Sequence, residues 1–142
     1  MDILKTALGE FGISEINGPA NNRRIVQYSK DIGYGKTVLT EDTAWCSIFI
    51  NWCAQKSGLE SSGKLNARSW LNVGEEVKTP IAGDIVILWR ENKTSWKGHV
   101  GIYINELKGK IYVLGGNQSN QVKISGYDSG RLLGYRRLNK KQ

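Results

Sequence analysis

The sequence predicts an α+β fold in which N-terminal helices, one of them buried, pack on a C-terminal antiparallel sheet of about five strands. Up to Gly58, apolar residues recur at the spacing of amphipathic helices. After Pro80 they alternate or form short runs separated by turn residues, as strands do. Segment 45–53 is apolar around most of a helical circumference, which is typical of a helix in the middle of a fold. The length predicts a single domain, 1–142.

Two helices are predicted in the first 40 residues. Residues 3–11 place apolar side chains at helical spacing, and Gly12 is a suitable stop. Asn21 or Asn22 can cap a second helix, because a short amide side chain accepts hydrogen bonds from the free N–H groups of a first turn. Gly33 then ends that helix.

The buried helix is predicted to begin at Asp42 or Thr43, both suitable N-caps, and to end at Gly58. Two apolar stripes lie side by side on it, which leaves little polar surface for solvent. A short helical turn is expected at 66–71.

Strands are expected after Pro80, with turn residues between them. They cover residues 84–89, 99–105, 110–114, 121–124 and 131–138. Asp84 opens the first strand, and we interpret it as a turn residue bonded to backbone rather than as a catalytic acid. Helices followed by an antiparallel meander give the α+β class.

The composition narrows the range of partners. A formal charge of +7 favours polyanions such as nucleic acid, anionic lipid or the bacterial wall. No arginine-rich run, helix-turn-helix signature or RNA-binding aromatic motif occurs, so we expect no nucleic-acid partner. No apolar run approaches the ~20 residues of a membrane span, and the first residues lack signal-peptide features. We therefore expect cytoplasmic synthesis without a signal peptide and no membrane span.

The two cysteines predict neither a disulfide nor a metal site. Cys46 and Cys53 lie two helical turns apart, about 10 Å along the axis, which is too far for a disulfide. A zinc site usually needs four ligands with a close cysteine pair, and the chain has only one histidine to add.

Cys46 is the candidate nucleophile. It lies in the first turn of the predicted buried helix, where unpaired N–H groups and the helix dipole stabilise a thiolate. The alternative is a small buried hydrophobe, which is how we interpret Cys53.

His99 is the candidate base. It opens a strand beside Gly98 and Gly101, which let another backbone or a substrate approach closely. A sheet packed on the buried helix would bring it to Cys46 for nucleophilic catalysis. A purely structural role is the alternative for a lone histidine beside apolar residues.

A base also needs a partner on its second ring nitrogen. The stretch 115–120, at the end of the next strand, supplies amide side chains in a turn that contains two glycines. We expect Asn117 to orient His99, with Gln118 as the alternative. A simple loop is the other interpretation of this stretch.

Four segments carry a resemblance to a known family. In order along the chain they are 42–52, 80–88, 98–103 and 113–118. Together they resemble the papain-like bacterial cell-wall hydrolases of the NlpC and CHAP type (cysteine-, histidine-dependent amidohydrolase/peptidase), over nearly the whole chain. The resemblance implies a papain-like α+β fold, a peptidoglycan substrate, no metal or organic cofactor, and the roles of nucleophile for Cys46 and base for His99.

The third catalytic position departs from the pattern of this family. Many CHAP sequences carry a glutamate two residues before an asparagine on this strand. Gly115 stands in place of that glutamate, while Asn117 matches the asparagine. Many NlpC-type enzymes use a histidine instead, and this chain has no second histidine.

A substrate groove is expected to contain aromatic rings, which commonly hold glycans and peptides. The candidate groove residues are the aromatic Trp45, Trp70 and Trp96 and the polar Ser69 and Gln118. Buried core is an equal alternative for Trp45 and Trp70, and Trp96 is expected to be the exposed ring.

The predicted function is hydrolysis of a peptidoglycan amide bond, by an N-acetylmuramoyl-L-alanine amidase or a stem-peptide endopeptidase. The alternatives are an acyl or amide transferase on the same scaffold and a non-catalytic basic wall-binding module. A phage endolysin or a secreted toxin, the latter with an inhibitor or immunity protein as partner, suits a wall hydrolase without a signal peptide. We expect a monomer that acts on the wall after release or delivery.

Overall fold

The computed structural model describes residues 2–40 and 44–142. Its α-helices are α1 (Ile3–Leu8), α2 (Arg23–Asp31) and α3 (Cys46–Lys56). Its strands are β1 (Glu75–Val77), β2 (Ile85–Trp89), β3 (Gly98–Leu107), β4 (Lys110–Gln118), β5 (Gln121–Asp128) and β6 (Leu132–Arg137). The strands form one antiparallel sheet in the order β1-β6-β2-β3-β4-β5. The α+β class is confirmed, but the sheet has six strands rather than about five.

The strand that the sequence reasoning missed is β1, at one edge of the sheet. It is only three residues long and begins with two glutamates, so it lacks the apolar alternation that signals a strand. Its stability comes from pairing, because Glu75 lies opposite Arg137 and Glu76 opposite Arg136. Gly74 precedes it at φ +69, and a Cβ there would collide with the carbonyl oxygen of Arg137.

The first two helices follow the prediction except at one end. α1 stops at Leu8 rather than continuing over the predicted 3–11, because the N–H of Gly12 bonds to the carbonyl of Val122 in β5, 2.8 Å away. α2 is capped by Asn22, whose side-chain oxygen accepts hydrogen bonds from two N–H groups of the first turn.

The third helix, α3, is buried along most of its length. It begins at Cys46, and its N-cap is Trp45, whose side chain makes no capping hydrogen bond. The predicted caps, Asp42 and Thr43, lie outside the described residues. The first nine residues of the helix are all buried. Gly58 follows the helix at φ +70, as expected of a stop.

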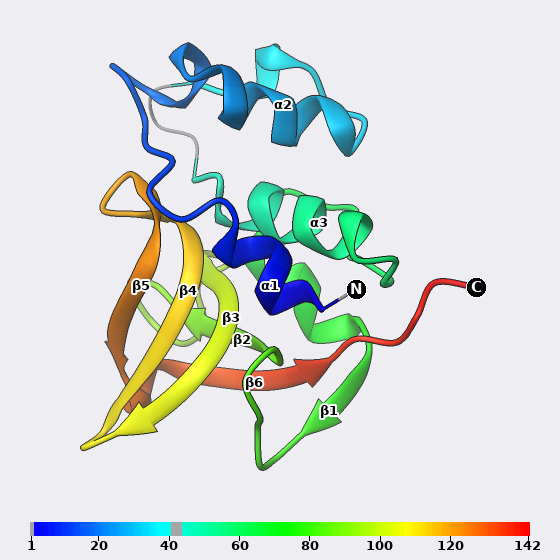
Figure 1. Ribbon diagram of the computed structural model, residues 1–142. Helices are drawn as coiled ribbons and strands as arrows, with labels where there is room; N and C mark the ends of the chain where they lie inside the picture. The colour runs from blue at the N-terminus through cyan, green and yellow to red at the C-terminus, as the bar shows by residue number, and fades with distance from the viewer. Residues whose placement is uncertain (1, 41–43) are drawn as a thin grey trace.

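The helix α3 lies between α2 and the sheet (Figure 1), and it packs on β3 and β4. The alternation of side chains along each strand gives the sheet two apolar faces. The face toward the helices carries Ile85, Ile87, Val100, Ile102 and Leu114. The opposite face carries Val86, Leu88, Ile111, Val113 and Tyr135.

Asp84 holds the turn that leads into β2. Its carboxylate accepts a hydrogen bond of 2.8 Å from the N–H of Ile81, which agrees with its interpretation as a turn residue. Arg137 of β6 also donates two hydrogen bonds to this buried carboxylate, so the turn is tied to the neighbouring strand.

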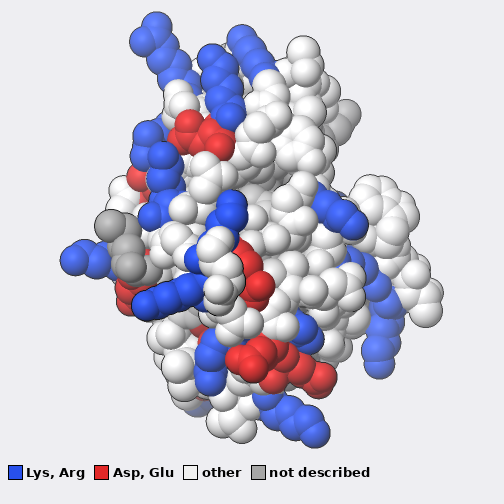
Figure 2. Space-filling view, turned by 90° about the vertical axis from the view of Figure 1, so that its right-hand side faces the viewer, with Lys and Arg blue, Asp and Glu red and all other residues white. Residues whose placement is uncertain are grey.

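On the face shown in Figure 2, cationic side chains are spread out rather than gathered in one patch. Figure 2 shows Lys and Arg from the top to the bottom of one face, with acidic side chains between them. Among the described residues, no helix has the length and apolar character needed to cross a membrane.

Candidate active site

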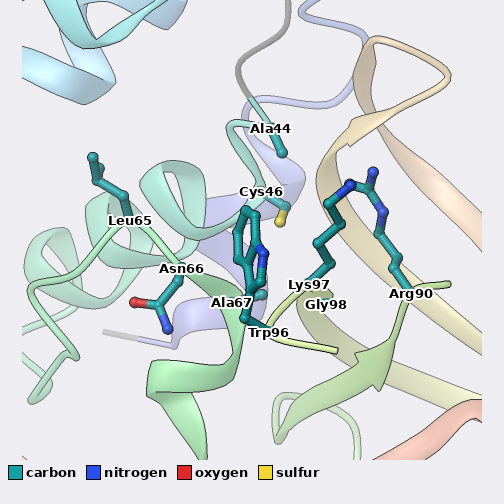
Figure 3. A pocket seen from close by; sticks show the side chains of 9 residues that line it. All are labelled: Ala44, Cys46, Leu65, Asn66, Ala67, Arg90, Trp96, Lys97 and Gly98. Atoms are coloured by element: carbon teal, nitrogen blue, oxygen red, sulfur yellow. The ribbon is translucent and has the colours of Figure 1, made fainter. Parts of the chain in front are cut away.

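Cys46 occupies the first position of α3. The first N–H groups of a helix have no intrahelical acceptor, and the helix dipole adds positive potential at that end. Only 3% of Cys46 is exposed, yet it borders a surface cleft, where its sulfur is seen in Figure 3. This position suits a thiolate that a substrate can approach.

His99 reaches Cys46 because β3 opens beside the start of α3. Pairing between β3 and β4 stops where Ile102 lies opposite Leu114, so the first residues of β3 meet the helix instead. The backbone N–H of Val100 points to the Cys46 sulfur for the same reason. The structure thus brings together the two residues that the sequence paired.

The two side chains shift each other's pKa. Burial opposes a thiolate at Cys46, but the His99 charge, its hydrogen bond and nearby backbone N–H groups outweigh burial and hold the pKa of Cys46 below its ordinary value. Burial also opposes a charged His99, but the Cys46 charge and hydrogen bonds with Cys46 and Gln118 raise the pKa of His99. The geometry therefore favours the thiolate–imidazolium form of the pair.

The second ring nitrogen of His99 is bonded to Gln118. Oε1 of Gln118 lies 2.8 Å from Nε2 of His99. The amide nitrogen of Gln118 donates to the carbonyls of Val113 and Lys123, at 3.0 and 2.6 Å. Because both carbonyls need a donor, the amide oxygen must face the ring, and Nε2 must carry a proton. Nδ1 of His99 is then the atom left to take the thiol proton.

Asn117, the first choice for this position, is not the residue that the structure places on His99. The register of β4 shifts between Gly115 and Gln118, and Asn117 adopts a left-handed φ of 59° within that bulge. An extra residue in a strand changes which side chain points to which face. Gln118 is brought to the imidazole instead, and only 2% of it is exposed.

Gly115 leaves the space that the Gln118 amide occupies. A Cβ at residue 115 would lie 2.8 Å from Oε1 of Gln118 and 3.5 Å from Nε2 of His99. Any side chain at this position would therefore occupy the space that the amide needs beside the imidazole.

Tyr127 is a neighbour of His99 that the sequence reasoning missed. Its hydroxyl lies 3.3 Å from Nε2, and the two ring centroids are 5.1 Å apart. Burial, followed by the Cys46 charge, raises the pKa of Tyr127 to about 12, so the phenol stays neutral. No sequence signal pointed to it, because the predicted strand 121–124 ended before it.

Two of the predicted groove residues, Trp45 and Trp70, belong to the core. Neither ring is exposed, and burial is tolerated because each indole N–H has a hydrogen-bond partner inside the fold. The N–H of Trp45 donates to Glu15 over 3.0 Å, and that of Trp70 donates to Oγ of Ser47 over the same distance. Their assignment to a substrate groove is corrected by this burial.

The other three predicted groove residues differ in their position relative to the cleft. Trp96 is 72% exposed and lines the cleft, as expected. Ser69 is buried, and its hydroxyl donates to the carbonyl of Asn66, so it shapes the cleft wall without lining it. Gln118 faces His99 rather than the cleft.

The cleft beside Cys46 has a volume of about 360 Å³. Figure 3 shows the side chains that line it: Ala44, Cys46, Leu65, Asn66, Ala67, Arg90, Trp96, Lys97 and Gly98. Arg90 and Lys97 were not among the predicted site residues. Both flank the loop that leads directly to His99. This closeness in sequence to the candidate base could have identified them as site residues.

Arg68 fixes the two walls of the cleft relative to each other. It follows the lining segment 65–67, and its guanidinium donates to three carbonyls of the facing loop, at 2.8–3.1 Å. Those carbonyls belong to Asn92, Lys93 and Lys97. The cleft is therefore largely formed before any ligand binds.

Within the described part of the chain, no three His, Cys, Asp or Glu residues lie together in a way that could hold a metal ion. Cys46 and Cys53 are both free, as their spacing predicted. Burial raises the pKa of Cys53 well above its ordinary value, in contrast to Cys46.

Comparison with known families gives a match over the part of the chain that holds the site. The family model described as CHAP domain matches residues 38–117, which is more than half of the chain and includes both Cys46 and His99. A search of curated proteins finds no match. The matched range ends at Asn117, one residue before the amide that bonds to His99.

Proposed function

Because the chain belongs to the CHAP domain family, we propose that it hydrolyses an amide bond of peptidoglycan with Cys46 as nucleophile and His99 as general base. Membership of this family implies amidase or peptidase activity on peptidoglycan in general. The thiol mechanism, the individual residues and the bond cleaved are the parts that we propose.

One observation carries the proposal. Cys46 and His99 form an ionisable pair at the start of a buried helix, and the thiol borders an open cleft. A purely structural cysteine would have a raised pKa, as Cys53 has, rather than a lowered one. This contrast within one helix also disfavours a non-catalytic wall-binding module.

The reaction begins with Nδ1 of His99 holding the thiol proton. The Cys46 sulfur attacks the amide carbonyl, and the resulting oxyanion is bound by the Cys46 N–H, which has no acceptor within the helix. The imidazolium then gives its proton to the leaving amine as the C–N bond breaks, which leaves a thioester. His99 next takes a proton from water, which attacks the thioester and releases a carboxylate and the free thiol.

Gln118 acts as a positioning residue in this scheme. Its oxygen accepts a hydrogen bond from Nε2 of His99 and so keeps Nδ1 directed to the sulfur. The amide carries no charge, so ionisation of Cys46 depends on the imidazole and on the backbone N–H groups of the helix start.

The test is digestion of purified peptidoglycan by the intact protein and by Cys46→Ala and His99→Ala. Cys53→Ala is the matched control, because it removes the second thiol of the same helix without touching the cleft. We expect soluble fragments from the unchanged protein and from Cys53→Ala alone. Mass spectrometry of the new termini distinguishes muramoyl-L-alanine cleavage from cleavage within the stem peptide. Fragments released by Cys46→Ala at an undiminished rate would exclude the proposed mechanism.

The acceptor of the acyl group is tested separately. A hydrolase incorporates one oxygen of labelled water into the product carboxyl, whereas an acyl transferase passes the acyl group to an amine or alcohol. Digestion in water enriched in ¹⁸O therefore distinguishes the two reactions that this scaffold permits.

A further inference from the structure

The two walls of the Cys46 cleft differ in chemistry. One wall carries Leu65 and Ala67, and the other carries Arg90 and Lys97. In Figure 3 both cationic side chains rise on the same side of the Cys46 sulfur. Arg90 directly follows β2 and Lys97 directly precedes β3, and a backbone hydrogen bond of 3.4 Å joins them.

The two cations differ in whether their charge is already paired. Nζ of Lys97 lies 2.7 Å from a carboxylate oxygen of Glu91. Arg90 makes no ion pair with any residue in the ranges 2–40 and 44–142, and its side chain is exposed. Its charge also reaches the site, since it opposes protonation of His99.

Comparison with the other arginines shows that, among the described residues, the unpaired guanidinium of Arg90 is unusual in this protein. Most of them are bonded within the fold, to a carboxylate or to backbone carbonyls: Arg24, Arg68, Arg131, Arg136 and Arg137. Among contacts between described residues, only Arg23 and Arg90 lack such a bond, and Arg90 is the one that lines the cleft. A guanidinium presents a rigid fork that matches a carboxylate with two parallel hydrogen bonds.

We propose that Arg90 binds a substrate carboxylate close to the scissile amide, so that the cleft selects stem peptides with a free carboxyl there over the amidated form. This inference rests on the proposed function. Lys97, paired with Glu91, adds positive potential but leaves the direct contact to Arg90. Leu65 and Ala67 then face the apolar part of the same peptide.

The first test needs no substrate. Iodoacetate and iodoacetamide alkylate the same thiolate, but only iodoacetate carries a carboxylate, so the ratio of their rates reports the attraction of anions to Cys46. We expect Arg90→Gln to lower that ratio at least threefold and Arg90→Lys to lower it less. Changes in thiolate fraction affect both reagents equally and leave the ratio unaltered. Mass spectrometry with Cys46→Ala as the blank assigns the modified residue.

Lys108→Asn is the matched control for this test. It removes one positive charge at the far end of β3, about 30 Å from His99 along the strand. Lys108 adopts a φ of 52°, which asparagine tolerates. If Lys108→Asn lowers the ratio as much as Arg90→Gln does, or if Arg90→Gln leaves it unchanged, the assignment to Arg90 is wrong.

The second test uses two stem peptides that differ only in whether the carboxyl nearest the scissile amide is free or amidated. We expect the unchanged protein to favour the free acid about tenfold in kcat/KM, as for a charge-assisted hydrogen bond. Arg90→Gln should bring the two peptides close to parity, because kcat/KM falls much more for the free acid than for the amidated form. An equal loss on both peptides would overturn the proposal, as would equal use of the two peptides by the unchanged protein.

The two tests separate failure of this inference from failure of the proposed function. If neither peptide is cleaved in a Cys46-dependent way, the hydrolase assignment fails. The alkylation ratio still decides, in that case, whether Arg90 attracts carboxylates to the thiol.

Discussion

The side-chain oxygen of Gln118 lies 2.8 Å from Nε2 of His99, and both donors of the same amide are used by backbone carbonyls. The amide therefore cannot rotate to offer its nitrogen without losing two buried hydrogen bonds. This arrangement fixes the orientation of the imidazole and leaves its other nitrogen for the Cys46 thiol. The group that orients the imidazole of His99 is thus a neutral amide.

We predict that Gln118→Ala lowers kcat/KM for wall fragments about tenfold to a hundredfold, because the imidazole loses the bond that sets its orientation. Steady-state kinetics on a defined fragment measure this effect. Asn117→Gly is the control, since glycine accepts the left-handed φ of that residue. We expect it to retain activity within about threefold. A larger loss with Asn117→Gly than with Gln118→Ala would reverse the assignment.

Gly115→Ala tests the same bond from the other side. The new Cβ would lie 2.8 Å from Oε1 of Gln118 and must displace the amide from His99. We expect about a tenfold loss of kcat/KM, whereas Gly35→Ala, whose Cβ meets only ordinary contacts, should have no effect. The double variant with Gln118→Ala should be no worse than Gln118→Ala alone, because the clash has been removed. Additive losses in the double-mutant cycle would show that Gly115 acts by another route.

Tyr127→Phe removes the second, longer contact to the imidazole while keeping the ring that packs on it. Because the hydroxyl lies 3.3 Å from Nε2, against 2.8 Å for Gln118, its bond is the weaker one. We expect kcat/KM to fall only about twofold to threefold. Kinetics of the two variants under identical conditions rank the contacts, and a loss beyond that of Gln118→Ala would contradict this order.

The proximity of Cys46 and His99 was predictable because its signals are local. A helix start before a buried segment placed Cys46, and the glycines around His99 marked the start of a strand. The order of helices and strands then required the sheet to pack on the helix. Asp84 is a similar case, since its turn is formed by a hydrogen bond to the N–H of Ile81, three residues away.

The choice between Asn117 and Gln118 as partner of His99 was not predictable, because it depends on register. A one-residue shift in β4 decides whether residue 117 or residue 118 faces the imidazole, and composition does not fix such a shift. The burial of Trp45 and Trp70 depends on acceptors far away in the sequence, Glu15 and Ser47. β1 depends on strand pairing with β6, which lies far away in the sequence, rather than on an apolar pattern.

The pH dependence follows from the two opposite shifts. Although burial opposes both charges, the pKa of Cys46 is lowered and that of His99 is raised, chiefly because the charged form of each side chain favours the charged form of the other. Alkylation of Cys46 by iodoacetamide should therefore have its midpoint at a lower pH than alkylation of an ordinary thiol. His99→Ala should move that midpoint upward, because burial alone raises the pKa of the thiol. An unchanged midpoint in His99→Ala would show that the pair does not interact.

Ser47 links the start of α3 to the wall of the cleft, and its removal should cost stability. Its hydroxyl accepts from the buried indole of Trp70 and donates to the carbonyl of Lys64, at 3.0 and 2.7 Å. Ser47→Ala leaves both groups without this partner, so we expect the free energy of unfolding to fall by about 1–3 kcal/mol. Urea titration followed by tryptophan fluorescence measures the change, with the exposed Ser61→Ala as the control. Equal midpoints for the two variants would show that water or a neighbouring group replaces the hydroxyl at no cost.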